Sequence, residues 1–220
     1  MRMLITAGAT REMLDPVRFI SNLSTGRMGY MLAEVARKRK HKVVLISAPT
    51  SLTAPAEVEF ISVISTQQML SAVKRCFSKA DCLIMCAAVA DYRPYTVVKE
   101  KIRRAKKSLL LRLIQTPDIL AQISREKAGK ILVGFSLEDK DYIKRSREKL
   151  KRKGLDFIVV NRIQKGGSPF GESKVYGAIL DKEGDIERFK GIGKEDLAQR
   201  ILNKVEALWA RRSEKEGGDK

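Results

Sequence analysis

The sequence predicts an α/β domain of three layers, with an open, mostly parallel sheet and a β-hairpin extension near its C-terminus. Strand-like and helix-like segments alternate from the first residues onward. Several strand-like segments are apolar throughout, as expected of strands buried on both faces. Glycine or polar residues follow the strand ends, where such sheets bind ligands. We expect one domain over residues 1–212 and a disordered basic tail over residues 213–220.

In the first half, residues 26–40 have one apolar face and predict a helix, and Ser65 with Gln68 forms a capping box for a second helix through Phe77. Strands are expected at residues 3–8, 42–47, 57–64 and 82–89.

In the second half, Thr116 is expected to cap a helix that begins at Pro117, and Gly154 to end a basic helix over residues 141–153. A last helix is expected over residues 194–211. Strands are expected at residues 109–113, 131–135, 157–160, 175–180 and 186–189, the last two forming the hairpin.

Composition narrows the function classes. No apolar run approaches the roughly 18 residues of a membrane span and no secretory signal is visible, so we expect a cytoplasmic protein without membrane contact. Three cysteines and one histidine make no zinc pattern, and Cys82 and Cys86 read as packed, reduced thiols in a buried strand. Histidine is the commonest general base in enzymes, and this chain has only one.

The net charge of +18 indicates an anionic partner, either nucleic acid or a small, highly charged substrate. Basic residues cluster at 99–107, 144–153 and 210–220, but aromatic residues are only 6% and do not alternate with them. This pattern argues against a surface on which bases stack. A basic nucleic-acid-binding protein is the alternative hypothesis, which steeply salt-dependent binding would support.

The opening segment is typical of a phosphate site. Gly8 ends the first strand, and Gly26 and Gly29 open the first helix, where backbone N–H groups favour anions. A long polar insertion separates the two glycine sites, unlike a dinucleotide-binding turn. The second strand ends at Ser47 without the acid that holds a nicotinamide ribose, so a nicotinamide oxidoreductase is disfavoured.

Further polar clusters follow other strand ends, at 87–94, 134–138 and 161–162. Lys101 lies in a basic loop that could close over an anion, and Lys149 and Lys153 share one helix face. Together these groups favour a nucleoside triphosphate as ligand.

These motifs closely resemble the phosphopantothenoylcysteine synthetase family of coenzyme A biosynthesis, a Rossmann-like fold, over roughly residues 3–210. The matching segments are 6–12, 15–22, 24–29, 87–94, 101–102, 117–120, 134–135 and 149–161. In many prokaryotes this synthetase is fused behind a flavin-dependent decarboxylase, which has no counterpart here, so we expect a free-standing enzyme or an excised domain. Residues 169–175 depart from the longer turn common in the family.

The resemblance implies an amide-forming ligase that joins 4'-phosphopantothenate to L-cysteine, using CTP with Mg²⁺ (or Mn²⁺) through an acyl-cytidylate. Base selection often rests on backbone contacts, so the sequence leaves CTP against ATP open. The resemblance also implies a homodimer, with the lysine loop able to reach the neighbouring subunit. The hairpin over residues 175–189 is expected to be part of the interface.

The resemblance also implies residue roles. Lys101 would act with Lys149 and Lys153 on the triphosphate, while Asn22, with Arg18 and Ala88, would serve the second half-reaction. Asp91 would lie near the ribose or the metal. The expected nucleotide-binding residues are Gly8, Ser24, Gly26, Gly29, Ala87, Ala88, Asp91, Pro117, Asp118, Ile119, Leu120, Phe135, Lys149, Lys153 and Asn161.

Overall fold

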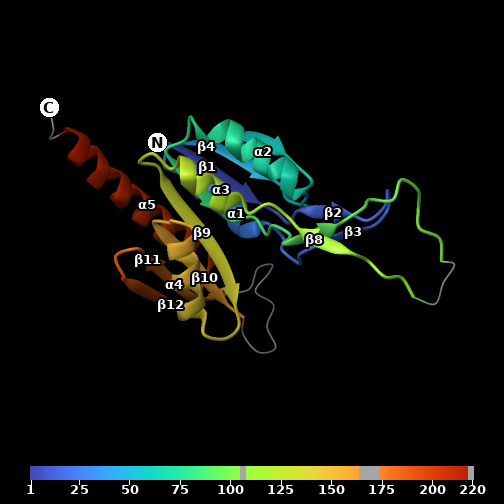
Figure 1. The fold of residues 1–220 in the computed structure, drawn as a ribbon. Helices are drawn as coiled ribbons and strands as arrows, with labels where there is room; N and C mark the ends of the chain where they lie inside the picture. The colour runs from blue at the N-terminus through green and yellow to red at the C-terminus, as the bar shows by residue number, and fades with distance from the viewer. Residues whose placement is uncertain (105–107, 164–173, 218–220) are drawn as a thin grey trace.

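The computed structural model describes residues 1–104, 108–163 and 174–217, and centres on an eight-stranded sheet of order β12-β11-β10-β9-β6-β1-β4-β5 (Figure 1). The strands are β1 (Arg2–Ala7), β4 (Lys42–Ser47), β5 (Glu59–Ser62), β6 (Cys82–Met85), β9 (Ile131–Glu138), β10 (Phe157–Arg162), β11 (Val175–Asp181) and β12 (Ile186–Ile192). The six strands from β10 to β5 are parallel, and β11 and β12 add an antiparallel hairpin. The mostly parallel sheet with its C-terminal hairpin is therefore confirmed.

The strand order reverses at β1. The chain runs from β1 outward to β4 and β5, then returns past β1 to β6 and continues outward on the other side. A parallel bridge between Ala9 and Ala88 joins the segments that follow β1 and β6. Such a reversal opens a crevice at the carboxyl ends of the strands, which is where open α/β sheets bind ligands.

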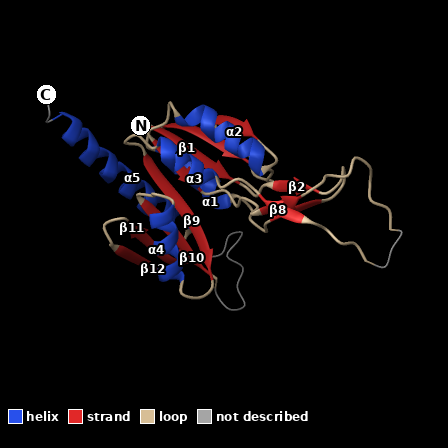
Figure 2. Cartoon of the chain, viewed as in Figure 1, coloured by secondary structure: helices blue, strands red, loops and turns tan. Residues whose placement is uncertain are grey.

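Helices cover both faces of the sheet (Figure 2). Helices α1 (Arg27–Lys38) and α5 (Lys194–Gly217) pack on the face that Met3 and Ile5 share. Helices α2 (Thr66–Phe77), α3 (Ile119–Ile123) and α4 (Tyr142–Arg152) cover the opposite face, which Leu4 helps to fill, and the 3₁₀ turn η1 (Ser124–Glu126) follows α3. Among the described residues, no helix is long and apolar enough to cross a membrane.

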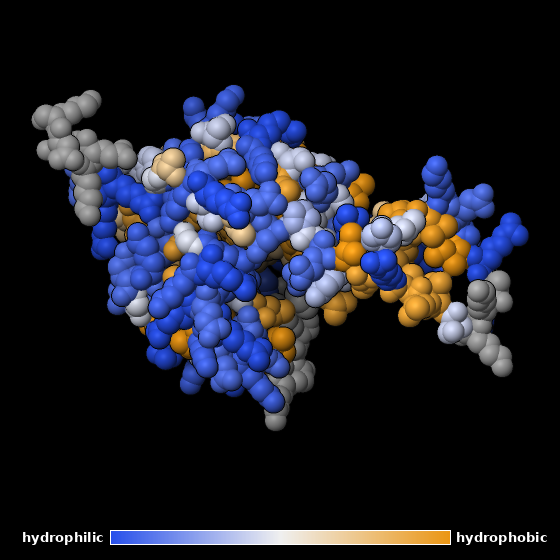
Figure 3. All heavy atoms as spheres, in the orientation of Figure 1, coloured by the Kyte–Doolittle hydropathy of each residue, from blue (hydrophilic) through white to orange (hydrophobic). Residues whose placement is uncertain are grey.

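Two short hairpins project from the carboxyl edge of the sheet. They pair β2 (Arg11–Met13) with β3 (Phe19–Ser21), and β7 (Tyr92–Pro94) with β8 (Leu113–Gln115). We call the described residues 11–21, 92–104 and 108–115 the arm, which extends to the right of the body in Figure 1. Apolar residues gather on it in Figure 3, and Leu110 is 97% exposed.

Several local expectations were wrong. The strand expected at residues 109–113 lies instead at Leu113–Gln115. Asp118, rather than Thr116, caps the helix that follows, because its carboxylate accepts the Ala121 N–H at 3.1 Å. The strand expected over residues 82–89 ends at Met85, since the next residues bend into the crevice.

The C-terminal helix is longer than expected. Helix α5 continues to Gly217, past the expected end at Arg211 and into the segment expected to be a disordered tail. Arg212 explains the continuation in part, because its guanidinium contacts the Asp156 carboxylate. Residues 218–220, and residues 169–173 of the divergent turn, lie outside the described part of the chain.

Candidate active site

The crevice at the carboxyl edge of the sheet is a pocket of about 890 Å³. It brings together segments from the beginning, middle and end of the chain. Of the residues expected to bind or react, those that line it are Asn22, Ser24, Gly26, Ala87, Ala88, Asp91, Pro117, Asp118, Ile119, Leu120, Phe135, Lys149, Lys153 and Asn161. The expected clusters therefore meet in one place.

The N-terminus of α1 forms one wall of the pocket. Gly26 takes the cap position with φ of 79°, a conformation that glycine adopts without strain. No side chain caps the helix, and the Gly26 N–H instead meets the Ser24 hydroxyl at 3.3 Å. The first-turn N–H groups of α1 thus lie beside the cavity without a capping side chain, as an anion site requires.

Gly8 and Gly29 do not line the pocket; they shape the backbone behind it. A Cβ on Gly8 would lie 2.4 Å from the Ala48 carbonyl oxygen, and one on Gly29 would lie 2.6 Å from the Ala7 Cβ. These contacts let α1 and the turn after β1 approach the sheet closely. In the structure, the two glycines position the anion wall and do not face its contents.

The segment after β6 forms the floor of the pocket and is held by backbone and hydroxyl contacts. The Ala88 N–H donates to the Gly8 carbonyl at 2.8 Å, and the Ala90 N–H donates to the Thr10 hydroxyl at 2.8 Å. The Thr116 hydroxyl donates to the Ala90 carbonyl at 2.6 Å, which is its role in place of helix capping. The floor is therefore fixed before any ligand arrives.

Asn22 reaches this floor from the segment before α1. Its Nδ2 lies 3.2 Å from both the Ala88 and Val89 carbonyl oxygens. Because both partners are acceptors, the side-chain nitrogen must face them. The amide is therefore anchored at the lining of the pocket, next to Ala88, with which it was expected to act.

The opposite wall is cationic. Lys149 Nζ donates to the Phe135 carbonyl at 2.8 Å, and Lys153 Nζ lies 3.1 Å from Asp118 Oδ1. Burial, and then the charge of Lys153, lower the pKa of Lys149 from its ordinary value. Two ammonium groups that repel each other on one wall of a cavity favour an anion bound beside them.

Asn161 lines the same wall and has a buried side-chain oxygen, Oδ1, without a hydrogen-bond partner among the described residues. A buried, unsatisfied acceptor is costly and calls for an explanation. A ligand amine or hydroxyl placed in the pocket would supply the missing donor. Phe135, beside it, offers an aromatic face for a base.

Two expected catalytic residues, Arg18 and Lys101, lie on the arm and do not line the pocket of their own chain. Arg18 Nε donates to Asp15 Oδ2 at 2.9 Å, and its Nη2 donates to the Ile102 carbonyl at 2.6 Å. The structure therefore places Arg18 against the backbone next to Lys101, and neither residue lines the pocket with Asn22 and the nucleotide wall.

Two pocket cations were missed by the sequence reasoning. Arg27, at the start of α1, and Lys194, at the start of α5, both line the cavity. Burial, and next the charge of Arg27, lower the pKa of Lys194. Arg27 lies in the segment 24–29 that carries the family resemblance, so it could have been predicted, whereas no local pattern marks Lys194.

The thiols near the pocket are not nucleophiles. Cys82 and Cys86 are free and unreactive, because burial raises the pKa of both and that of Cys86 to about 12. Cys82 lies in the buried strand as expected, whereas Cys86 follows the end of β6 and is half-buried in the lining of the pocket.

Among the described residues, no cluster of three or more His, Cys, Asp or Glu side chains could hold a metal ion alone. The pocket contains Asp91, and Asp118 is paired with Lys153. Mg²⁺ in nucleotide sites is commonly held by one or two carboxylates together with substrate phosphates. This donor set therefore fits a magnesium ion that arrives with a triphosphate.

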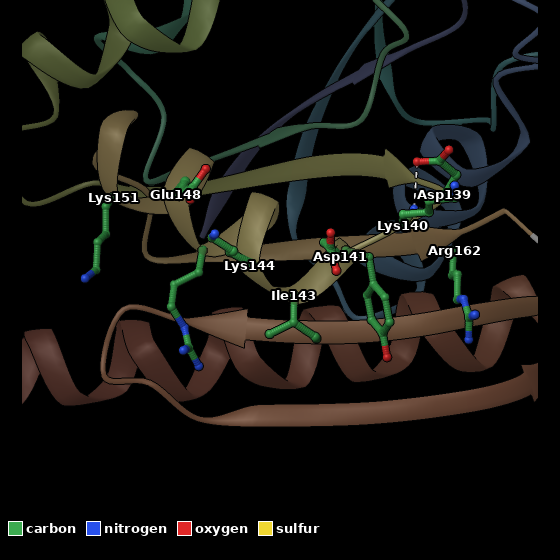
Figure 4. Close-up of a pocket in the computed structure, with 10 residues that line it drawn as sticks. Asp139, Lys140, Asp141, Ile143, Lys144, Glu148, Lys151 and Arg162 are labelled. Carbon is green, nitrogen blue, oxygen red and sulfur yellow. Dashed lines mark hydrogen bonds between the residues drawn. The ribbon is translucent and has the colours of Figure 1, made fainter.

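A second hollow, of about 830 Å³, lies along the outer side of α4 (Figure 4). Figure 4 shows Lys144, Lys151 and Arg162 around it together with Asp139, Asp141 and Glu148. None of the expected site residues lines it. Its charges are of mixed sign and largely exposed, so the crevice at the strand ends is the better candidate site.

Comparison with known proteins gives the family. Residues 1–208 match the family described as "DNA/pantothenate metabolism flavoprotein C-terminal domain". The chain belongs to this family. It is 41% identical over 206 residues to the coenzyme A biosynthesis bifunctional protein CoaBC of Bacillus subtilis, covering 93% of this chain and 51% of that protein. The CoaBC protein of Vibrio cholerae is 40% identical, with 93% and 52% covered.

The chain thus spans about half the length of the curated relatives it matches. It also resembles a crystal structure of the C-terminal domain of a CoaBC protein, with a TM-score of 0.82, 35% identity and 96% of each chain covered. A Cab2 mutant in complex with phosphopantothenate-cysteine shares the fold, with a TM-score of 0.76 at 17% identity over 96% of this chain and 88% of that one. The family resemblance found in the sequence is therefore confirmed.

Proposed function

We propose that this chain is a phosphopantothenate–cysteine ligase that uses CTP and forms an acyl-cytidylate. The observation that carries the proposal is the pocket itself. In a member of this family, an uncapped helix N-terminus, an anchored amide, a lysine pair and an unsatisfied buried acceptor line one cavity. The ligand of the Cab2 complex, phosphopantothenate-cysteine, supports the substrate class.

In this proposal the nucleoside occupies the wall made by Phe135, the segment 117–120 and Asn161. The unsatisfied Oδ1 of Asn161 accepts a hydrogen bond from the ribose or the base. The phosphates lie between the α1 N-terminus and the lysine pair Lys149 and Lys153, which neutralises their charge.

The first half-reaction is nucleotidyl transfer. The carboxylate of phosphopantothenate attacks the α-phosphorus of CTP, a P–O bond forms to the carboxylate, and the bond to pyrophosphate breaks. Such chemistry needs positioning and charge neutralisation more than a protein nucleophile, which fits a pocket with inert thiols and no histidine. Lys101 would stabilise the departing pyrophosphate.

The second half-reaction forms the amide. The cysteine amine attacks the acyl carbon, the C–N bond forms, CMP leaves, and the amine proton passes to solvent. Asn22 lines the pocket, where one of its N–H groups can turn from the Val89 carbonyl to the developing oxyanion.

A homodimer is part of the proposal. Lys101 does not line the pocket of its own chain, and the arm beside it exposes the apolar side chains Tyr95, Val97, Leu109 and Leu110. A second copy that covers the arm would bury these residues and bring Lys101 to the partner's pocket. The hairpin of β11 and β12 stays a prediction as a further part of the interface.

Mg²⁺, or Mn²⁺ in its place, would supply charge neutralisation on the triphosphate. Asp91 is the pocket carboxylate to hold it, because Asp118 is already paired with Lys153.

The proposal is tested by mixing the protein with phosphopantothenate, cysteine, Mg²⁺ and either CTP or ATP, and measuring pyrophosphate. We expect release with CTP; none with either nucleotide would rule the ligase out. Lys101→Ala should abolish formation of the intermediate, whereas Asn22→Asp should let it accumulate. Light scattering of the native chain and of Leu110→Glu tests the dimer, since a monomer in both would contradict it.

A further inference from the structure

We propose that Asp15 is a positioning residue that clamps Ile102 and thereby fixes Lys101 on the arm. The inference rests on the proposed function for the role of Lys101, but the clamp itself is a property of the fold. It is made by a buried carboxylate on one hairpin of the arm and by the loop of the other.

The Asp15 side chain is fully buried and accepts hydrogen bonds on both oxygens. Oδ1 accepts the N–H groups of Val17 and Arg18, each at 2.8 Å. Oδ2 accepts the Nε–H of Arg18 at 2.9 Å and the N–H of Ile102 at 3.1 Å, a residue 87 positions along the chain. One carboxylate therefore accepts backbone N–H groups from its own turn and from a loop distant in the sequence.

Arg18 completes the clamp. While its Nε binds Asp15, its Nη2 donates to the Ile102 carbonyl at 2.6 Å. Both backbone polar groups of Ile102 are thus held by the Asp15–Arg18 pair. The loop has another backbone anchor before Lys101, where the Val98 N–H donates to the Leu14 carbonyl at 3.0 Å. Among the described residues from Lys99 to Arg104, only Ile102 has its backbone hydrogen-bonded to another segment.

The clamp is insensitive to ordinary changes of pH. Burial by itself would raise the pKa of Asp15, but the N–H donors of Val17, Ile102 and Arg18 outweigh it and hold the pKa well below its usual range. The carboxylate therefore stays ionised at any pH at which the enzyme would work.

A fixed Ile102 has a direct consequence for its neighbour Lys101. Without the clamp, the described backbone from Lys99 to Arg104 would have no hydrogen bond to another segment, and Lys101 would sample many positions. That conformational freedom would be lost when the anion binds. With the backbone held one residue away, only the lysine side chain remains to be ordered. This is the kind of positioning that accelerates a reaction without contact to the substrate.

The decisive comparison is Ile102→Pro against Ile102→Ala. Proline lacks the N–H that Asp15 accepts, whereas alanine retains it, and both changes lie in an exposed loop that the core does not require. We expect pyrophosphate release in a single turnover to slow by about tenfold or more in the proline variant, with KM for phosphopantothenate unchanged. The alanine variant should stay within about twofold of the native chain. Equal rates in the two variants would overturn the proposal.

A second measurement does not depend on activity. Lys99, Lys101, Arg103 and Arg104 are trypsin sites that flank the clamped residue. In the native protein we expect cleavage here to be slow, and to accelerate about tenfold in Asp15→Asn when both proteins are digested well below their melting temperatures. Equal cleavage in the native and Asp15→Asn proteins would overturn the clamp. If the protein forms no amide at all, the proposed function fails but this cleavage result still decides the clamp.

Discussion

Basic side chains cluster at two places, one at the amino ends and one at the carboxyl ends of the sheet strands. The two clusters differ in the source of the negative charge that balances them. Just before β10, the fully buried Asp156 carboxylate forms ion pairs with Lys127 Nζ at 2.9 Å, Lys182 Nζ at 3.6 Å and the Arg212 guanidinium. It also accepts the Leu132 N–H at 2.9 Å. We call these residues the Asp156 cluster, in which the chain supplies its own anion.

In the pocket, the half-buried Lys149 donates to a carbonyl and is repelled by Lys153. Among the described residues that line the pocket, no buried carboxylate plays the part of Asp156; Asp118, the partner of Lys153, is 45% exposed. Cations of the first kind stabilise the fold, while cations of the second kind oppose it until a ligand supplies the anion. Under the proposed function, the Asp156 cluster is structural charge and the pocket lysines are charge reserved for a ligand.

The largest expected effect comes from removing the internal anion. Asp156→Asn should lower the free energy of unfolding by about 3 kcal/mol, because it leaves a cluster of partly buried cations without their carboxylate. Urea denaturation measures the change, and KM for the nucleotide should stay the same. A loss below about 1 kcal/mol would show that the cluster is not structural.

A pocket lysine should behave in the opposite way. Lys149→Gln should raise KM for the nucleotide by about tenfold to a hundredfold, the cost of about 1.5–3 kcal/mol for one hydrogen bond to a charged group. The free energy of unfolding should not fall, because the variant removes a partly desolvated charge. A drop in stability without a change in KM would place Lys149 with the Asp156 cluster.

The lowered pKa of Lys149 gives a pH test. Burial and Lys153 make this lysine lose its proton sooner than an ordinary lysine as the pH rises. Nucleotide affinity should therefore fall as the pH rises through the lowered pKa. For stability the sign is reversed, since a folded pKa below the unfolded value favours the fold as the pH increases. Lys149→Arg should remove the alkaline loss of affinity, and persistence of the loss would assign it to another group.

The smallest effect is expected two residues away. Lys151 lies on the outer side of α4 (Figure 4), is exposed and has no ion pair among the described residues. Lys151→Gln removes the same charge from the same helix, so we expect less than a twofold change in KM and no change in stability. A change as large as that of Lys149→Gln would mean that net charge, and not the pocket wall, governs affinity.

Much of the architecture could be predicted because local signals agreed with the fold. Residues 42–47 were expected as a strand and form one with the same bounds, and the capping box of Ser65 and Gln68 opens α2 as expected. The glycine turn and the lysine pair were likewise visible as patterns, and the structure brings them into one pocket.

Other features had no local signal. The strands of the arm are three residues long and their pairing is decided by contacts across the chain. Thr116 and Asp118 are both residue types that cap helices well. In the structure the Thr116 hydroxyl is bound to the Ala90 carbonyl, so Asp118 caps the helix instead. Lys194 lines the pocket because the first residue of α5 lies beside the cavity. A sequence pattern predicts where a helix begins along the chain but not where that end lies in the fold.

The sequence alone determined the chain order of the eight sheet strands and of the five described α-helices, the chemistry-bearing motifs and the family, because periodicity, caps and glycine turns act within a few residues. The tertiary structure decided which of those residues share a cavity. It put Asn22 on the Ala88 carbonyl, Arg18 on Asp15 and Ile102, and three cations on Asp156. These contacts join segments far apart in the chain, so they depend on the sheet order and on burial, and neither can be read from spacing.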